Sequence, residues 1–198
     1  MDVISVPTTE ATKKKISFED YLLMPEINHP YEIIDGEFMP SPAPIPAHQR
    51  MSANIFKRLD EHVEAKGLGV VLFAPVDIIL QRHPLRTRQP DVLFIHKDKL
   101  SGTGFDAIEE LQILEIAPDL VVEVLSTSDT ERVLSGKLAD YQPIGVKECW
   151  LVSREARSVE GLQLTKEQSQ SLGHFGLGET IRSEVLPNFQ MTVDAIFT

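Results

Sequence analysis

Cysteine is nearly absent from this chain of 198 residues, which contains Cys149 alone. A single cysteine cannot form an intrachain disulfide, and we interpret Cys149 as a small core residue of a protein in a reducing compartment. No apolar run approaches the roughly 20 residues that a membrane-spanning helix needs, and the N-terminus has no apolar stretch of the signal-peptide type. We therefore expect a cytoplasmic protein without membrane segments.

Several well-known catalytic motifs are also missing from the sequence. It has no glycine-rich phosphate loop, no cysteine and histidine spacing typical of zinc sites, and no Gly-x-Ser-x-Gly sequence. Nucleoside-triphosphate chemistry and a serine nucleophile are therefore poorly supported. No internal repeat or low-complexity tract divides the chain.

Positive charge is scarce, because 19 lysines and arginines face 30 aspartates and glutamates, which gives a formal net charge of −11. This balance argues against nucleic-acid binding through a broad basic surface. Basic residues nevertheless gather around one apolar segment, at Arg82, His83, Arg86, Arg88, Lys97 and Lys99. We expect the first four to lie in a loop. Two interpretations stay open: a local basic rim around a site, or a solvated loop without a partner.

The N-terminal half predicts an arm followed by a helix, a hairpin and a long helix. Residues 1–16 are expected to form a flexible arm, and residues 17–198 a single domain. Ser17 is a suitable cap for a helix over 18–24, and Asp35-Gly36 is a suitable turn for a hairpin over 31–39. A helix over about 47–66, ending at Gly67 or Gly69, is indicated by an apolar stripe at Met51, Ile55, Leu59 and Val63.

The remaining pattern predicts strands over 70–73, 76–80, 91–95, 120–125 and 148–152, with loop and short helix between 96 and 117. A helix over about 129–141 should end at Pro143 and Gly145, and its expected inner face is Val133, Leu134, Leu138 and Tyr141. Residues 157–164 should form a hairpin with the preceding strand, before further β structure and a helix over 192–197. We therefore expect a mixed α/β (α+β) fold, with a mixed central sheet flanked by helices and a β-rich extension.

Glu123 lies within residues 119–125, a run that is otherwise typical of a strand buried on both faces. An isolated buried charge is very unfavourable unless it is paired or bound to a metal. Asp91 opens a second apolar strand, and Lys137 lies on the helix predicted after Glu123. Two carboxylates suit a hard cation, and a lysine can orient the attacking water or stabilise developing charge, as in metal-dependent phosphodiester cleavage. The alternative is a polar strand start at Asp91 and a structural ion pair between Glu123 and Lys137.

The ordered set of motifs resembles the Uma-two family of restriction endonucleases, which belongs to the PD-(D/E)XK, restriction-endonuclease-like superfamily. The matching positions are Tyr-Glu-Ile-Ile-Asp-Gly-Glu over 31–37, His48, Gln-Pro-Asp over 89–91, and the segments 118–126, 137–141, 145–146 and 148–152. The resemblance covers roughly residues 17–165. No single motif is specific, but their order is.

The resemblance implies a restriction-endonuclease-like fold and a set of site residues. Asp91 and Glu123 take the places of the superfamily's two acidic residues, and the backbone carbonyl of Val124 is implied as a further metal contact. The superfamily's lysine would stand at Leu125, so its role is expected to have moved to Lys137. Two auxiliary candidates are Glu37 and His48, whose alternatives are an exposed strand carboxylate and a surface histidine. Gln89 is a further residue that could line the site.

Taken together, the residues and the resemblance predict an endonuclease that hydrolyses DNA phosphodiester bonds with Mg²⁺ or Mn²⁺. Two alternatives stay open. One is a catalytically inactive binding module on a nuclease fold, and the other is a metal-dependent hydrolase of a different phosphoester. Because relatives of this kind often act as homodimers, a homodimer is one expected assembly.

Overall fold

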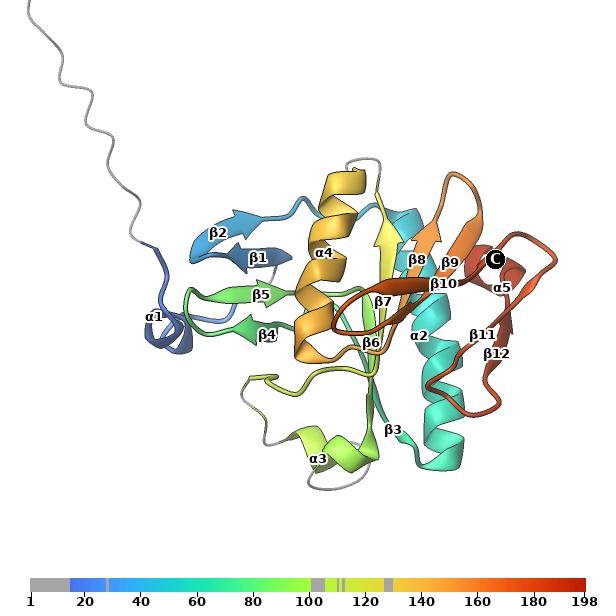
Figure 1. The fold of residues 1–198 in the computed structure, drawn as a ribbon, viewed down its shortest axis with the longest axis horizontal. Helices are drawn as coiled ribbons and strands as arrows, with labels where there is room; N and C mark the ends of the chain where they lie inside the picture. The colour runs from blue at the N-terminus through green and yellow to red at the C-terminus, as the bar shows by residue number, and fades with distance from the viewer. Residues whose placement is uncertain (1–14, 28, 101–105, 110, 112, 127–129) are drawn as a thin grey trace, which may run out of the picture.

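The computed structural model describes residues 15–198, apart from residues 28, 101–105, 110, 112 and 127–129. A mixed six-stranded sheet in the order β10-β9-β8-β7-β6-β3 forms its centre (Figure 1). The strands are β3 (Gly69–Phe73), β6 (Val92–His96), β7 (Leu120–Leu125), β8 (Glu148–Ser153), β9 (Ser158–Leu164) and β10 (Ser169–Phe175). Only the β7–β8 pair is parallel in this sheet, and the other neighbours are antiparallel. The expected mixed central sheet is thus confirmed.

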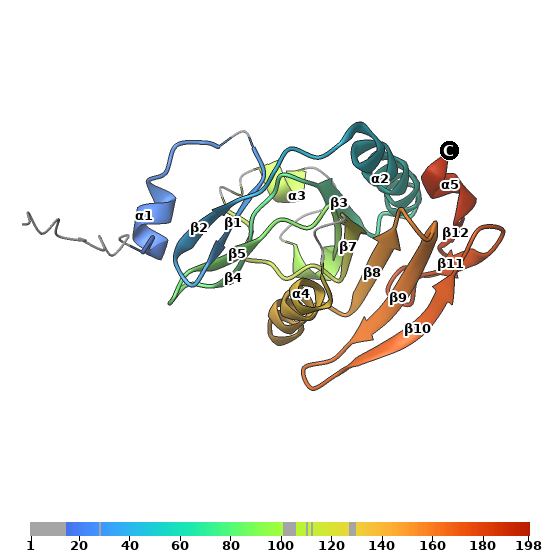
Figure 2. The same cartoon turned by 90° about the horizontal axis from the view of Figure 1, so that it is seen from above.

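Two helices cover opposite faces of the sheet, α2 (Pro46–Lys66) on one side and α4 (Glu131–Ile144) on the other (Figure 2). Side chains alternate between the two faces along each strand. Val122 and Val124 belong to the hydrophobic cluster that includes α2. Val121 and Leu151 belong to the cluster that includes α4. The period of two therefore points Glu123 toward α4.

The long helix α2 begins and ends as the sequence predicts. Pro46 occupies its first turn, where a missing N–H is harmless, and Gly67 ends it with a left-handed φ of 58°. The predicted apolar stripe is buried, at Met51, Ile55, Leu59 and Val63. Packing of this stripe against the sheet supplies most of the helix's stability.

Two small antiparallel sheets lie beside the central sheet, next to the short helix α1 (Phe18–Leu22). One pairs β1 (Tyr31–Ile34) with β2 (Glu37–Pro40), and the other pairs β4 (Ile78–Gln81) with β5 (Arg86–Arg88). The expected hairpin turn is confirmed, because Asp35 and Gly36 both have positive φ, of 52° and 80°. The expected loop is confirmed at Arg82 and His83, which lie in a turn, and was wrong at Arg86 and Arg88, which belong to β5.

The C-terminal extension consists of β11 (Thr180–Arg182), β12 (Gln190–Thr192) and α5 (Asp194–Phe197). The buried carboxylate of Glu148 on β8 anchors it. Oε2 of Glu148 accepts hydrogen bonds from the Ser183 hydroxyl and from the backbone of Glu184 and Val185, and Oε1 accepts one from the Trp150 indole.

Two short helices, η1 (Lys97–Lys99) and α3 (Asp106–Glu109), lie between β6 and β7.

Helix α4 differs from the sequence prediction at two positions. Val133 is 39% exposed, so its placement on the inner face was wrong, whereas Tyr141 is fully buried. Pro143 lies inside the last turn, and the helix ends only at Gly145, whose left-handed backbone donates to the carbonyls of Gln142 and Tyr141. A proline near a helix end removes few hydrogen bonds, so the helix tolerates it.

No helix in the described ranges is long and apolar enough to cross a membrane. The predicted arm over residues 1–16 falls almost entirely outside the described residues. Ile16, at its end, donates a hydrogen bond of 2.8 Å to the carbonyl of Gly36. The flexible arm and the single-domain boundary at residue 17 stay predictions.

Candidate active site

Asp91 and Glu123 come together because of the register between β6 and β7. The antiparallel ladder pairs Val92 with Val122 and Leu93 with Val121. Continuing the same register by one residue sets Asp91 opposite Glu123, on the face that α4 covers. Residues opposite one another on antiparallel strands have Cβ atoms about 4.5–5.5 Å apart. The sheet therefore brings together two carboxylates that are far apart in the sequence.

Glu123 is only 4% exposed, and both of its oxygens receive donors from α4. Lys137 Nζ lies 2.6 Å from Oε2, and the Tyr141 hydroxyl donates to Oε1 at 2.5 Å. Burial raises the pKa of Glu123, and the nearby Asp91 charge raises it further, whereas Lys137 and the Tyr141 hydrogen bond lower it. Burial also raises the pKa of Tyr141, so its hydroxyl stays protonated and continues to donate.

Asp91 is held by the backbone of β7 and by the first turn of α2. Oδ2 of Asp91 accepts a hydrogen bond of 2.7 Å from Val124 N–H. Nε2 of His48 lies 3.0 Å from the Val124 carbonyl oxygen and 3.4 Å from Oδ2 of Asp91. Because both neighbours of Nε2 are acceptors, this nitrogen must carry a proton. The hydrogen bond to Asp91 raises the pKa of His48, although burial of the ring acts in the opposite direction.

The donor atoms of this cluster are the kind that hard divalent cations prefer. Asp91 and Glu123 offer carboxylate oxygens, and Val124 offers a carbonyl oxygen. Oδ1 of Asp91 accepts no hydrogen bond from any described residue. In the described ranges no three His, Cys, Asp or Glu side chains form a group that could hold a metal. Mg²⁺ needs only one or two carboxylates beside water and substrate phosphate, so these residues fit it.

The arginines before Asp91 do not form the basic rim that was one interpretation of the sequence. Arg88 is 8% exposed, and its Nε and Nη2 donate to Oδ2 of Asp140 on α4 at 2.9 and 2.7 Å. Its Nη1 donates to Glu32 at 2.5 Å. Arg86 bridges Asp140, at 2.6 Å, and Asp35, at 2.8 Å. For Arg86 and Arg88 the solvated-loop interpretation was wrong as well, because both side chains have carboxylate partners.

These ion pairs hold α4 in place against β5 and the β1–β2 hairpin. Asp140 precedes Tyr141 and lies one turn after Lys137 on α4. The two side chains that contact Glu123 thus depend on the bonds that Arg86 and Arg88 make. Arg82 lies farther out, where it forms an exposed pair with Glu115, with contacts of 2.7 and 2.8 Å.

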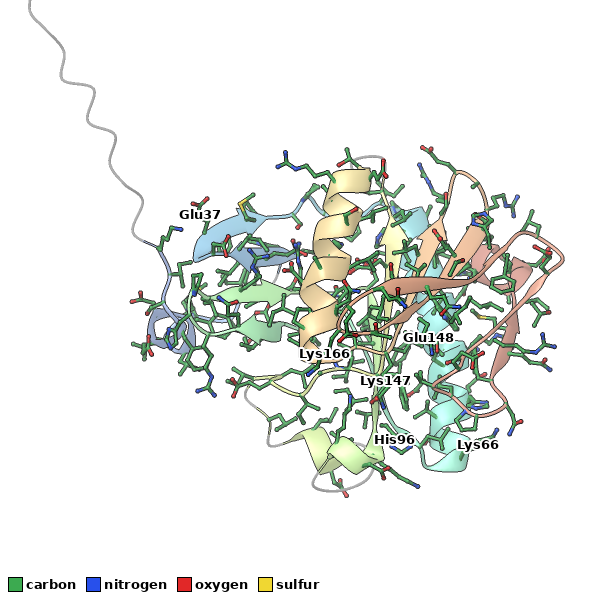
Figure 3. The ribbon with its side chains drawn as sticks, viewed as in Figure 1. Glu37, Lys66, His96, Lys147, Glu148 and Lys166 are labelled. Atoms are coloured by element: carbon green, nitrogen blue, oxygen red, sulfur yellow. The ribbon has the colours of Figure 1, made fainter. Side chains whose placement is uncertain are left out.

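Most of the predicted site residues converge on this cluster, and Glu37 does not. Asp91, Glu123, Lys137, His48 and the Val124 backbone are linked by the contacts given above. Glu37 is exposed on β2, where Figure 3 shows its side chain at the end of the hairpin. Within the described part of the chain, no hydrogen bond or ion pair connects it to the cluster. Its auxiliary role stays a prediction.

Sequence reasoning placed Tyr141 on the inner face of α4 but gave it no role in the site. The spacing of Lys137 and Tyr141 could have indicated this role, because residues four apart share a face of the helix.

Gln89 lies beside the cluster without entering it. Its side chain donates to Asp77 at 3.1 Å and, with Tyr21 and Tyr31, lines a neighbouring cavity of about 560 Å³.

Two further buried carboxylates show that burial alone does not mark this site. Glu148 is held by the extension, as described above. Asp119 precedes β7 at the opposite end of that strand, where Lys99 and Lys147 lie 3.0 and 2.9 Å from its Oδ1 and the His96 amide donates to Oδ2. Figure 3 labels Lys147, His96 and Glu148 in this region. Burial would raise the pKa of Asp119, but the hydrogen bonds from Lys147, His96 and Lys99 lower it.

A mixed sheet between two helices, with Asp91 just before β6, Glu123 within β7 and Lys137 on α4 paired with Glu123, is typical of a restriction-endonuclease-like fold. A profile of the Uma2 family, described as "Putative restriction endonuclease", matches residues 18–194, so the chain belongs to that family. The resemblance seen in the sequence is therefore confirmed.

A solved structure with the same fold comes from Anabaena variabilis and is titled a "putative nuclease belonging to DUF820". The similarity has a TM-score of 0.75 and covers 92% of this chain and 97% of that chain, at 15% sequence identity. This likeness supports the expected fold class. None of the curated proteins compared with this chain matches it.

Proposed function

We propose that the protein is an endonuclease that hydrolyses DNA phosphodiester bonds with the help of Mg²⁺ or Mn²⁺. The observation that carries the proposal is the β6–β7 register, which, continued by one residue, sets Asp91 opposite Glu123, with Lys137 Nζ 2.6 Å from Glu123. A purely structural ion pair needs only Glu123 and Lys137. Asp91 adds a second carboxylate, whose Oδ2 is held by Val124 N–H and His48 and whose Oδ1 accepts no hydrogen bond from the described residues.

The roles of the residues follow from their contacts. Asp91, Glu123 and the Val124 carbonyl would hold the cation, which when bound polarises the phosphoryl group and lowers the pKa of a coordinated water. Lys137 Nζ donates to the oxygen of the attacking water and orients it, while its charge stabilises the phosphate as negative charge develops. Tyr141 fixes the Glu123 carboxylate. His48 Nε2–H, shared between Val124 and Asp91, fixes the other half of the site.

A cleavage assay tests this proposal. Wild-type protein is incubated with supercoiled plasmid, single-stranded DNA, RNA or bis-p-nitrophenyl phosphate, with Mg²⁺, Mn²⁺ or EDTA. We expect nicking of DNA that requires the cation and disappears in Asp91→Asn. The matched control is Asp98→Asn, which removes an exposed carboxylate that is 79% accessible, and it should cleave like wild type. Cleavage of the small phosphodiester alone would favour a different phosphoesterase. Cleavage that persists in Asp91→Asn would remove Asp91 from the mechanism.

A second candidate is a nuclease fold that binds nucleic acid without cutting it. The position of Lys137 on a helix, with its ammonium committed to Glu123, favours this candidate. It predicts that DNA binds equally well to wild type and Asp91→Asn and is not cleaved with either cation.

We also propose a homodimer as the working assembly. Strand β10 forms an edge of the central sheet, and the unpaired backbone of an edge strand is a suitable surface for pairing with a second copy. Light scattering coupled to size exclusion measures the mass directly. A single species with the mass of one chain would contradict the proposed dimer and leave the nuclease proposal intact.

A further inference from the structure

Three exposed arginines surround a cavity next to the N-terminal end of α2. The cavity has a volume of about 350 Å³ and is lined by Ala47, Arg50, Met51, Arg154, Arg157, Ile196 and Phe197. The arginines come from two separate places, α2 and the connection between β8 and β9, and α5 supplies the apolar wall. A protein with a net charge of −11 thus concentrates three positive charges on one small surface.

These three arginines have no carboxylate partner among the described residues, unlike Arg82, Arg86 and Arg88. Arg50 donates from Nε to the carbonyl oxygen of Thr198 at 3.3 Å, which leaves its other N–H groups available. The guanidinium of Arg157 lies over the Phe197 ring, 5.5 Å from its centroid. That contact restrains the side chain without neutralising its charge.

The cavity lined by Arg50, Arg154 and Arg157, called the arginine cavity below, lies at the same end of the central strands as Asp91 and Glu123. In the parallel β7–β8 pair, Leu125 is opposite Ser153, and Arg154 follows immediately. Neighbouring strands are about 4.8 Å apart, so the connection after β8 begins close to the end of β7. Arg50 lies two residues after His48 on α2. Figure 1 shows the end of β7, the start of α2 and the β8–β9 connection together at the top of the view, and Figure 2 agrees.

We propose that Arg50, Arg154 and Arg157 bind a backbone phosphate of the nucleic-acid substrate beside the phosphate that is cleaved. The inference rests on the proposed nuclease function. A guanidinium presents paired N–H donors that match phosphate oxygens, and it keeps its charge at any physiological pH. A local basic site of this kind lets an acidic protein bind a polyanion, which its net charge would otherwise repel. A bound phosphate here would fix the direction in which the strand crosses the site.

The test compares Arg154→Gln/Arg157→Asn with the control Arg58→Gln/Arg182→Gln. Both double variants remove two exposed positive charges, and asparagine suits the left-handed φ of 49° at residue 157. Binding of a fluorescein-labelled DNA duplex is followed by anisotropy in EDTA across a series of salt concentrations. We expect the cavity variant to bind about tenfold or more weakly and its log–log salt slope to fall by about 2. In cleavage, KM should rise while kcat at saturating DNA is unchanged.

The outcomes separate this inference from the function on which it rests. If wild type binds and cleaves DNA, and the cavity variant matches the control in affinity and salt slope, the phosphate site is overturned and the nuclease stands. A lower kcat with unchanged KM would overturn it too, because the arginines would then act on the chemistry. If wild type neither binds nor cleaves DNA, both proposals fail.

Two further measurements distinguish loss of the phosphate site from unfolding and from binding of a different polyanion. Arg154→Gln alone keeps the Arg157–Phe197 contact, so a loss of affinity in this single variant supports the site even if the double variant unfolds. Polyglutamate serves as the competing probe. Weaker binding of polyglutamate by the cavity variant, with unchanged DNA affinity, would assign the cavity to an acidic peptide and overturn the proposal.

Discussion

Asp91 accepts a 2.7 Å hydrogen bond on Oδ2 from the backbone N–H of Val124, so one carboxylate of the site is oriented by the strand that carries the other. The same peptide region offers the Val124 carbonyl to His48. This arrangement holds the Asp91 carboxylate through Oδ2, and Oδ1 accepts no hydrogen bond from the residues that the structure describes. A ligand atom positioned in this way loses little conformational freedom when it binds a cation.

The first prediction concerns His48, whose pKa is raised chiefly by its hydrogen bond to Asp91. A histidine with a raised folded pKa stabilises the fold below its unfolded pKa of about 6.5, and this contribution is lost as pH rises through the folded pKa. In metal-free protein, Asp91→Asn should lower the pKa of His48 and remove that part of the pH dependence. NMR titration and urea unfolding measure the two effects. The exposed His174 is the internal control, and an unchanged His48 titration would contradict the prediction.

The second prediction is that Mn²⁺ affinity rises with pH because burial raises the pKa of Glu123. A carboxyl group with a raised folded pKa favours the fold at low pH, and this contribution is lost as pH rises through that pKa. A bound cation requires the ionised form, so affinity should climb over the same range and then level off. Saturating metal, at about 100 times Kd, should stabilise the protein by about 2.7 kcal/mol.

Calorimetry at several pH values measures this affinity directly. Glu123→Gln and Asp91→Asn should both abolish binding, while Asp98→Asn should leave it unchanged. Glu37→Gln, measured beside them, decides whether Glu37 has the auxiliary role that the sequence predicts. Affinity that is independent of pH in the wild type would exclude Glu123 as a ligand.

The third prediction concerns the Tyr141 hydroxyl, which donates to Oε1 of Glu123 inside the core. Tyr141→Phe leaves that oxygen without a donor and should destabilise the protein by about 1–3 kcal/mol. Because the lost hydrogen bond lowers the pKa of Glu123, the acid limb of the cleavage pH profile should move to higher pH. Tyr21→Phe, which removes a hydroxyl bonded to Asp77, is the matched control and should not move it. A fixed acid limb in Tyr141→Phe would limit Tyr141 to a structural role.

The fourth prediction separates rate from binding at Lys137. Lys137→Met keeps the length of the side chain but removes the donor that we assign to the attacking water. We expect kcat to fall about 10²–10³-fold, as for other lost transition-state donors, with metal binding retained. Lys147→Met removes a lysine paired with Asp119 at the other end of β7 and should keep wild-type kcat. Global unfolding of Lys137→Met would instead support a structural ion pair with Glu123.

The fifth prediction compares two arginine ion pairs of different burial. Arg88 and Asp140 have side chains that are 10% and 7% exposed, whereas those of Arg82 and Glu115 are 54% and 38% exposed. Removing one partner of a buried pair costs about 3–5 kcal/mol, and removing an exposed pair costs at most about 1 kcal/mol. Arg88→Met should therefore lower the free energy of unfolding far more than Arg82→Met. Equal losses in urea unfolding would contradict a role for Arg88 in holding α4.

Much of the scaffold follows from local pattern. The stripe on α2, the continuous apolar runs of β6 and β7 and the Asp35-Gly36 turn each depend on neighbouring residues, and each appears in the structure as predicted. The ends of the helices and strands followed less closely from the sequence. Pro143 lies in the last turn of α4, where a proline removes few hydrogen bonds, and the helix ends only at Gly145.

The chemical types in the site were also readable from the sequence, because a carboxylate in an apolar strand demands a partner. Asp91, Glu123 and Lys137 were predicted in this way, and their roles stay predictions. The sequence could not distinguish Glu123, which the strand register sets opposite Asp91, from Asp119 and Glu148, which are also buried but pair with other segments. That difference depends on which segments pack against each carboxylate.

What the sequence by itself determined, then, was which elements form and which residues need a partner, since both depend on local periodicity and residue chemistry. Only the tertiary structure decided which partner each one has. Arg86 and Arg88 lie next to Asp91 in sequence yet pair with Asp140, while Tyr141 reaches Glu123. The three arginines that line the cavity of about 350 Å³ have no carboxylate partner in the described structure. Such pairings are set by strand register and helix packing between distant segments, which no local pattern specifies.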